Sequence, residues 1–161
     1  MQSPLSVLTK TVSPETIHRG ANELPFVTSV PGVSSQLLHV NLQTGLWVTR
    51  VRLDPGYRSA RHYHHGEVFA FTTSGRWRYL EQDDINDAGS YLYEPAGAVH
   101  TQYVLEDNPA PAECWFSVLG RNDDLDDAGN VINNYGAEEI LDRYMTACEQ
   151  AGYGRPPVIG I

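Results

Sequence analysis

Three histidines at close, regular spacing are the residues of this chain best suited to chemistry. His62 and His64 stand two residues apart in the segment GYRSARHYHHGEV, and His100 lies in GSYLYEPAGAVHTQYV. Neutral imidazole nitrogens bind transition metals, among them Fe, Ni, Cu and Zn. Three protein ligands leave coordination positions of the metal open, and a substrate can react there. The spacing therefore predicts a metal site with a chemical function.

The spacing of His62 and His64 indicates a β-strand as the element that positions them. Side chains two residues apart in a strand point to the same face, so the two imidazoles can share one ion. Tyr63 and His65 then point to the other face, and we expect His65 at the surface. His100 must reach the same ion from a later strand.

Turn residues frame both histidine segments at fixed distances. Gly56 is followed by five residues and then by His-x-His, whereas Gly89, Pro95 and Gly97 precede His100 in the pattern Gly-x5-Pro-x-Gly-x2-His. Glycine permits the tight turns between strands, and proline fixes the bend that returns the later strand. These two patterns together resemble both halves of the cupin signature, over about residues 34 to 120. The resemblance implies a jelly-roll β-sandwich or barrel with an internal metal site.

Short β-type runs separated by turn residues continue through most of the chain, as is typical of a sandwich or barrel. Helical periodicity appears only after Tyr135, and Gly152 is the expected stop. This helix is expected to cover an open edge or end of the barrel, or to dock on a second subunit. We predict an all-β cupin jelly-roll with a C-terminal helix, divided into an N-terminal arm at 1–24, the cupin domain at 25–135, and the helix and tail at 136–161. The predicted strands lie near residues 26–30, 34–41, 45–53, 60–64, 67–73, 76–82, 89–94, 99–105, 112–120 and 130–134.

The position of a fourth metal ligand departs from the cupin pattern. Most metal-binding cupins place a glutamate four residues after the second histidine, and this chain has Val68 there. Glu67 would point to the opposite face of a regular strand, unless a β-bulge at His65-Gly66 turns it inward. Without that carboxylate, three neutral imidazoles leave the full charge of a divalent ion in place. Such a site favours an anionic, chelating substrate, for example an enolate.

Three further stretches narrow the resemblance within the cupins. The segments QLLH, SGRWRYLEQD and AGSYLYEPAGAVHT are similar to 2,4'-dihydroxyacetophenone dioxygenases and, more loosely, to acetylacetone dioxygenases. The resemblance implies a non-haem Fe(II) enzyme that uses O2 to cleave a C–C bond of a small ketone, giving carboxylic acid. The ketone would be an aryl hydroxyketone or a β-diketone. Its metal ligands would be His62, His64 and His100.

Other readings of the same site stay open. Zn, Ni, Mn or Cu could occupy three imidazoles as well as iron, which leaves a non-oxidative isomerase, lyase or hydrolase as an alternative. A metal- or ligand-sensing cupin is the second alternative.

Glu94 and Tyr79 are the further candidates for catalysis. Glu94 precedes Pro95 in an apolar and aromatic run, and acetylacetone dioxygenases carry a glutamate at the matching position. It could hold a ligand imidazole or deprotonate the substrate, or it could be a surface residue. Trp77 and Tyr79 alternate with two arginines along the predicted strand. Because the arginines are expected to face solvent, Trp77 and Tyr79 are expected to point inward. Tyr79 would then either fill the core or stack on an aryl ketone and donate a hydrogen bond to it.

Composition limits the partners of this chain of 161 residues. Its 11 Lys and Arg against 20 Asp and Glu give a net charge of -9, which argues against nucleic acids and anionic membranes. The acidic run at 123–127 is expected to be a solvated loop. Cys114 and Cys148 are expected to be small buried side chains without a disulfide, and the N-terminus lacks the apolar core of a signal peptide. We expect a cytoplasmic homodimer or homotetramer.

Overall fold

A computed structural model describes residues 15–161, so residues 1–14 of the predicted arm lie outside the described part. The chain forms short strands and, near its C-terminus, one helix of 14 residues within the described range. The elements are β1 Val27–Val30, β2 Val33–Asn41, β3 Leu46–Leu53, β4 Arg61–His64, β5 Val68–Ser74, β6 Trp77–Tyr79, β7 Tyr91–Glu94, β8 Val99–His100, β9 Gln102–Val104, β10 Ala112–Leu119, β11 Asn122–Leu125, β12 Val131–Tyr135 and α2 Ala137–Gln150.

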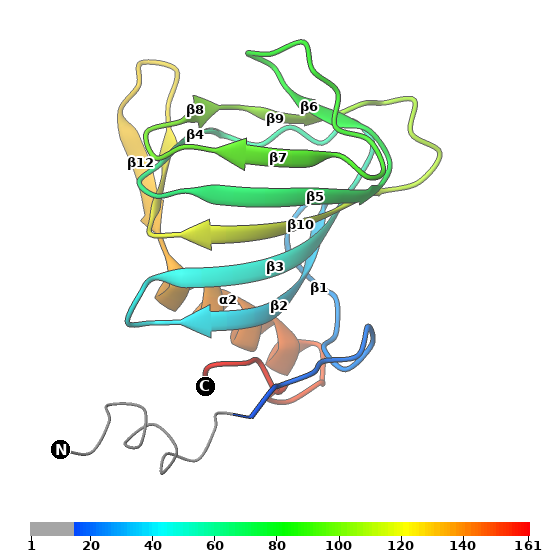
Figure 1. Cartoon of the computed structure of the whole chain (residues 1–161), viewed down its shortest axis with the longest axis vertical. Helices are drawn as coiled ribbons and strands as arrows, with labels where there is room; N and C mark the ends of the chain where they lie inside the picture. Colours follow the sequence, from blue (N-terminus) through cyan, green and yellow to red (C-terminus); the bar gives the residue numbers. More distant parts are fainter. Residues whose placement is uncertain (1–14) are drawn as a thin grey trace, which may run out of the picture.

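The strands build a sandwich of two facing walls (Figure 1). One wall is a sheet in the order β1-β2-β3-β10-β5-β7, and the other is a sheet in the order β12-β11-β4-β8. β6 and β9 form a short additional pair. The pairs within these sheets are antiparallel, as expected where short turns connect successive strands. The predicted all-β class is confirmed.

The interior contains two groups of buried side chains. Around Trp77, Tyr79 and Cys114 the core fills the end of the sandwich near β6 and β9. A second cluster, which includes Leu37 and Val118, packs against α2 at the other end. Cys114 and the helical Cys148 are both buried and unpaired, as the sequence predicts.

Helix α2 closes the end of the sandwich next to β1 and β2, at the bottom of Figure 1. Its predicted apolar face is turned inward, with Tyr144 and Cys148 buried and Ile140, Leu141 and Met145 partly buried against the core. The helix begins after Gly136, whose N–H donates to the Glu139 carboxylate at 2.8 Å. In residues 15–161 there is no helix long and apolar enough to cross a membrane.

The acidic run after Arg121 differs from the prediction of a solvated loop, because its first part is strand β11. β11 lies between β4 and β12, and its charges find partners across these pairs. Asp123 accepts from His65 at 2.7 Å, and Asp124 accepts from Asn133 at 3.2 Å. Composition alone pointed to a loop because it does not reveal cross-strand partners. Only the second part, around Asp126, is a turn.

The strand predicted at 99–105 is two strands that belong to different sheets. β8 pairs with β4, whereas β9 pairs with β6. Thr101 lies between them, and its backbone N–H donates to the Glu81 carboxylate at 2.8 Å. The Thr101 hydroxyl donates to the other oxygen of Glu81 at 3.0 Å. Glu81 therefore fixes the chain directly beside His100.

Candidate metal centre

The three predicted ligands converge on one point inside the sandwich. β4 and β8 pair with His62 opposite His100, and His64 follows two residues later on the same face of β4. One ring nitrogen from each histidine lies within 4.8 Å of the other two. The Nε2 atoms of His64 and His100 are 3.1 Å apart. Both of these residues are buried, and His62 is half-buried.

Hydrogen bonds on the far side of two rings leave their Nε2 atoms free for a metal. His62 Nδ1 lies 2.9 Å from the carbonyl oxygen of Ala60, and His64 Nδ1 lies 2.8 Å from Oδ1 of Asn122. Because both acceptors lack a hydrogen, each Nδ1 carries the ring proton and donates it. Nε2 of each ring therefore presents a lone pair to the centre. Asn122 belongs to β11, and sequence reasoning missed it because that segment was expected to be a loop.

Burial keeps two of the imidazoles neutral. Burial lowers the pKa of His62, and it lowers the pKa of His64 to about 4 against the opposing pull of the Glu94 carboxylate. The hydrogen bonds to Ala60 and Asn122 oppose burial only in part. At neutral pH both rings are in the form that binds a metal ion.

Glu94 places a carboxylate oxygen beside the same nitrogens. Its Oε2 lies 3.0 Å from His64 Nε2 and 3.2 Å from His100 Nε2, and the residue is only 3% exposed. These are salt-bridge distances, yet Oε2 accepts no hydrogen bond. The reason at His64 is that the ring proton is already donated to Asn122, so an oxygen lone pair faces a nitrogen lone pair.

A cation resolves this arrangement. The lone pairs of His64 Nε2 and Glu94 Oε2 face one another without a proton, and a positive ion beside them offsets their repulsion. With metal–nitrogen bonds of about 2.1 Å, neighbouring ligand atoms lie about 3 Å apart, which matches the separation of the Nε2 atoms of His64 and His100. The residues present therefore fit a transition-metal ion, with His62 as the third imidazole.

Tyr79 supports this cluster from behind. Its hydroxyl donates to Oε1 of Glu94, and its ring is stacked on His100 with centroids 3.6 Å apart and planes 8° from parallel. Burial and the neighbouring Glu94 carboxylate raise the pKa of Tyr79 well above its ordinary value, so the phenol keeps its proton. Burial would raise the pKa of Glu94, but its contacts with His100, His64 and Tyr79 outweigh burial and lower it. Tyr79 and Glu94 both line the cavity, as candidate catalytic residues must, while their roles stay predictions.

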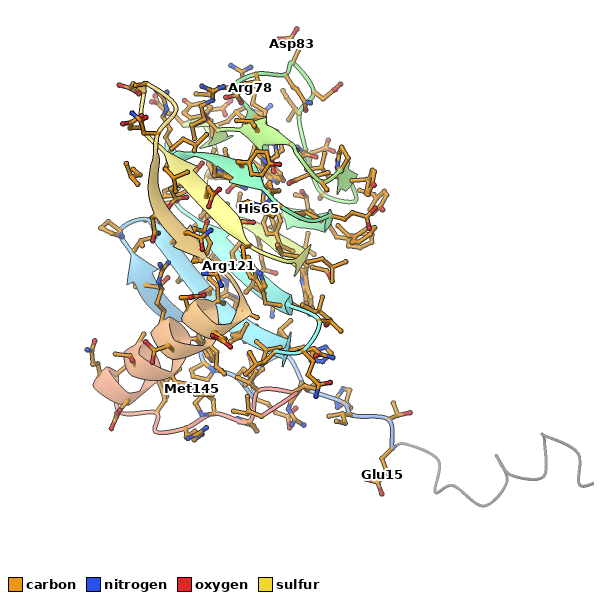
Figure 2. All side chains as sticks on the ribbon, turned by 90° about the vertical axis from the view of Figure 1, so that its left-hand side faces the viewer. Glu15, His65, Arg78, Asp83, Arg121 and Met145 are labelled. Atoms are coloured by element: carbon orange, nitrogen blue, oxygen red, sulfur yellow. The ribbon has the colours of Figure 1, made fainter. Side chains whose placement is uncertain are left out.

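Glu67 points away from the metal cluster. It accepts a hydrogen bond from the Tyr93 hydroxyl at 2.7 Å, whereas Val68 is buried and lines the cavity. No bulge turns Glu67 inward, so no carboxylate stands at the position where most metal-binding cupins have their glutamate ligand. The nearby carboxylate comes from Glu94 instead, which corrects the expectation that the site has no carboxylate. His65 lies at the surface as predicted and is labelled in Figure 2.

A cavity of about 420 Å³ opens from the histidines into the space between the walls. Most of its wall is apolar, and α2 contributes to it at the end away from β6. Its lining includes Leu37, Val51, Leu53, Val68, Phe116, Val118 and Ile140 among apolar residues, and Ser59, Gln102, Asn122, Asp124 and Arg143 among polar ones. A small organic molecule with an apolar body and a few oxygens fits such a space.

Comparisons with known proteins agree with this arrangement. The sequence matches the family described as ChrR cupin-like domains over residues 15–120. The acetylacetone-cleaving enzyme of Acinetobacter johnsonii is 29% identical over 136 residues, which cover 81% of this chain and 87% of that enzyme.

Solved structures show the same fold. A cupin-like protein of unknown function from Ralstonia eutropha JMP134 superposes with a TM-score of 0.86 at 26% identity, over 94% of this chain and 96% of the other. An RmlC-like cupin from the same bacterium gives 0.84 at 28% identity, over 92% and 98%. The acetylacetone dioxygenase structure from A. johnsonii gives 0.70 at 24% identity, over 86% and 95%, and by itself it supports the fold alone.

Proposed function

The chain belongs to the family of ChrR cupin-like domains, and from that premise we propose that it is a non-haem Fe(II)-dependent dioxygenase. In this proposal it uses O2 to cleave a C–C bond of a small ketone, either an aryl hydroxyketone or a β-diketone, and releases carboxylic acid. The observation that carries the proposal is the cluster of three imidazoles and Glu94 at the wall of an apolar cavity. The similarity to the acetylacetone-cleaving enzyme supports it.

The residues that would hold the iron are His62, His64 and His100. When bound, Fe(II) supplies the electrons and the open positions that dioxygen chemistry requires. The protein contributes the fixed orientation of the rings, through Ala60 and Asn122. Such outer hydrogen bonds keep ligands in place and raise their basicity.

Glu94 is suited to take a proton from the substrate. Its Oε1 accepts from Tyr79, and its Oε2 accepts no hydrogen bond within the described part of the protein. A ketone with an acidic C–H or enol O–H could lose that proton to Oε2 and become the anion that the positive site favours. Tyr79 keeps its own proton and holds the carboxylate in position. The apolar walls limit access of water to the anion.

The overall reaction balances without another reagent. One ketone and one O2 give a carboxylic acid and a second carbonyl product, with both oxygen atoms of O2 in the products. The C–C bond beside the carbonyl is the bond that breaks.

An oxygen electrode tests the proposal directly. Protein reconstituted with Fe(II) under anaerobic conditions is mixed with acetylacetone or an aryl hydroxyketone, and we expect one O2 to be consumed for each ketone cleaved. His100→Ala serves as the control without a complete ligand set. The absence of oxygen uptake across a broad ketone panel would contradict the proposal.

Two other functions would leave different signatures. Turnover of a substrate without oxygen, by protein loaded with Zn, Ni or Mn, would indicate an isomerase, lyase or hydrolase that uses Glu94 as its base. The second alternative is a metal- or ligand-sensing cupin. High-affinity metal binding without any turnover would indicate that role. We further propose a cytoplasmic setting, supported by two buried cysteines that form no disulfide.

A further inference from the structure

Gln102 presents a hydrogen-bond donor that the fold does not use. The residue begins β9, two positions after His100, and it lines the cavity. Its Nε2 is buried and has no hydrogen-bond partner among the described residues. Its backbone is held firmly, because the Gln102 N–H donates to the Ser59 hydroxyl at 2.9 Å and the Gln102 carbonyl accepts from the Ser59 N–H at 3.0 Å. The side chain is thus carried on a fixed strand beside the metal cluster.

Buried amides without partners are rare because their desolvation is not repaid. Leucine at this position would avoid that cost and would match the apolar wall. Gln102 therefore makes the fold less stable than leucine would. A ligand that accepts its unused hydrogen bond explains why glutamine stands there.

Three of the donors around the metal cluster are already engaged within the protein. The ring protons of His62 and His64 are donated to the protein, and the Tyr79 hydroxyl is donated to Glu94. Arg143, a charged donor of the cavity, belongs to α2 and lies over the Tyr135 ring at 5.1 Å. Gln102 consequently provides a free N–H next to the cluster, on the side of Tyr79, which it faces across the β6–β9 pair.

We propose that Gln102 is a substrate-binding residue whose amide donates to an oxygen atom of the metal-chelating ligand. It selects molecules that present a carbonyl or enolate oxygen beside the metal, and it disfavours ligands without an acceptor there. This inference rests on the proposed function only in that the substrate binds at the three histidines. It adds a residue that distinguishes oxygen chelators from other metal ligands.

A pair of ligands tests the proposal on Zn(II)-loaded protein, where no oxygen chemistry occurs. Acetohydroxamate chelates metals through two oxygens, which can accept a hydrogen bond from Gln102. Imidazole binds the metal through one nitrogen, and its other nitrogen carries a hydrogen and cannot accept one. Titration calorimetry compares wild type with Gln102→Leu. We expect the Kd for acetohydroxamate to rise about tenfold, as loss of one hydrogen bond implies, and the Kd for imidazole to stay unchanged. Gln102→Glu, which adds a negative charge near Glu94, should weaken acetohydroxamate further.

Thermal unfolding separates binding from a structural role. Without ligand, Gln102→Leu should unfold at the same temperature as wild type or higher, since an unpaired donor has been removed. The proposal would be overturned if Gln102→Leu unfolded at a lower temperature, or if it lost affinity for both ligands equally. It would also be overturned if the Kd for acetohydroxamate did not change, or if wild type did not bind acetohydroxamate. Because these readouts need no turnover, failure to detect ketone cleavage would leave the inference intact. Conversely, if the protein cleaves ketones but Gln102→Leu binds acetohydroxamate with the Kd of wild type, the inference about Gln102 is refuted while the proposed function stands.

Discussion

The position of individual ring protons determines what the histidine cluster can bind. The proton of His64 is donated to Asn122, so His64 Nε2 and Glu94 Oε2 face each other as two electron pairs. His-x-His spacing predicts that imidazoles share a face, because strand geometry follows from sequence distance. It does not predict Asn122, which is brought to His64 by a pairing across 58 positions of the chain.

Replacement of Asn122 by leucine should weaken metal binding. The ring of His64 would lose the acceptor that fixes its orientation, and loss of such partners costs about 10- to 100-fold in affinity. Competition with a chromogenic chelator measures the Kd for Zn(II). Asn134→Leu is the matched control, because the Asn134 amide bonds Asp123 and Arg121 rather than a histidine. Equal affinities of Asn122→Leu and wild type would show that the hydrogen bond is dispensable.

Glu94→Gln tests the carboxylate as a base. The amide keeps size and polarity but cannot take a proton, so kcat should fall by about 100-fold or more. Metal content, measured by elemental analysis after purification, should stay close to that of wild type if the three histidines hold the ion. Loss of metal instead of turnover would make Glu94 a ligand, and unchanged kinetics would remove it from the reaction.

At the level of strands, pairing explains what periodicity alone could not. The segment predicted as one strand at 99–105 contains no turn residue, yet it changes sheets at Thr101, whose backbone N–H donates to Glu81. β11 was missed because acidic side chains are uncommon in strands, and here each finds a cross-strand partner. The helix was predicted correctly because its apolar face repeats at helical spacing.

A cross-strand ion pair gives the sheet a pH-dependent contribution. Glu113 on β10 lies opposite Arg52 of β3 and contacts Arg50 at 2.8 Å. Burial raises the pKa of Glu113, but its bonds to Arg50, Arg52 and Thr73 outweigh burial and lower the pKa below its ordinary value. The carboxylate therefore stabilises the fold above the ordinary glutamate pKa, and the contribution is lost as pH falls through the lowered value.

Glu113→Gln should reduce stability by about 1 kcal/mol at pH 7 and by nothing at a pH well below the lowered pKa. Urea unfolding at a series of pH values measures the difference between variant and wild type. Glu106→Gln is the control, because Glu106 is exposed and forms no ion pair among residues 15–161. A difference that persists unchanged into acid would contradict the assignment to ionised Glu113.

For the whole molecule, the three histidines of one wall face Glu94 of the other wall across the interior. Removal of the ion leaves Glu94 Oε2 and the imidazole nitrogens facing one another, so the metal-free protein should be less stable. At a metal concentration 1,000 times Kd the expected difference is about 4 kcal/mol. Calorimetric unfolding before and after dialysis against a chelator measures it. His100→Ala should abolish the difference, and identical curves for the two forms of wild type would refute a metal at this place.

The oligomeric state remains a prediction. We expect a homodimer or homotetramer, and sedimentation equilibrium should give a mass two or four times the 17.9 kDa of the chain. A mass that stays at one chain over a wide concentration range would show a monomer.

The direct pairing of His62 with His100 has a consequence for the lifetime of the protein in a cell. β8 is only two residues long, and besides its own pairing it is held on β4 by two backbone bonds between His64 and the turn at Gly97 and Ala98, so an ion adds to a short set of bonds. Segments that open easily are the first to be cut, and degradation follows the population of the open form. Scarcity of the metal would then shorten the half-life of the chain, and the abundance of the protein would follow the supply of its own ion.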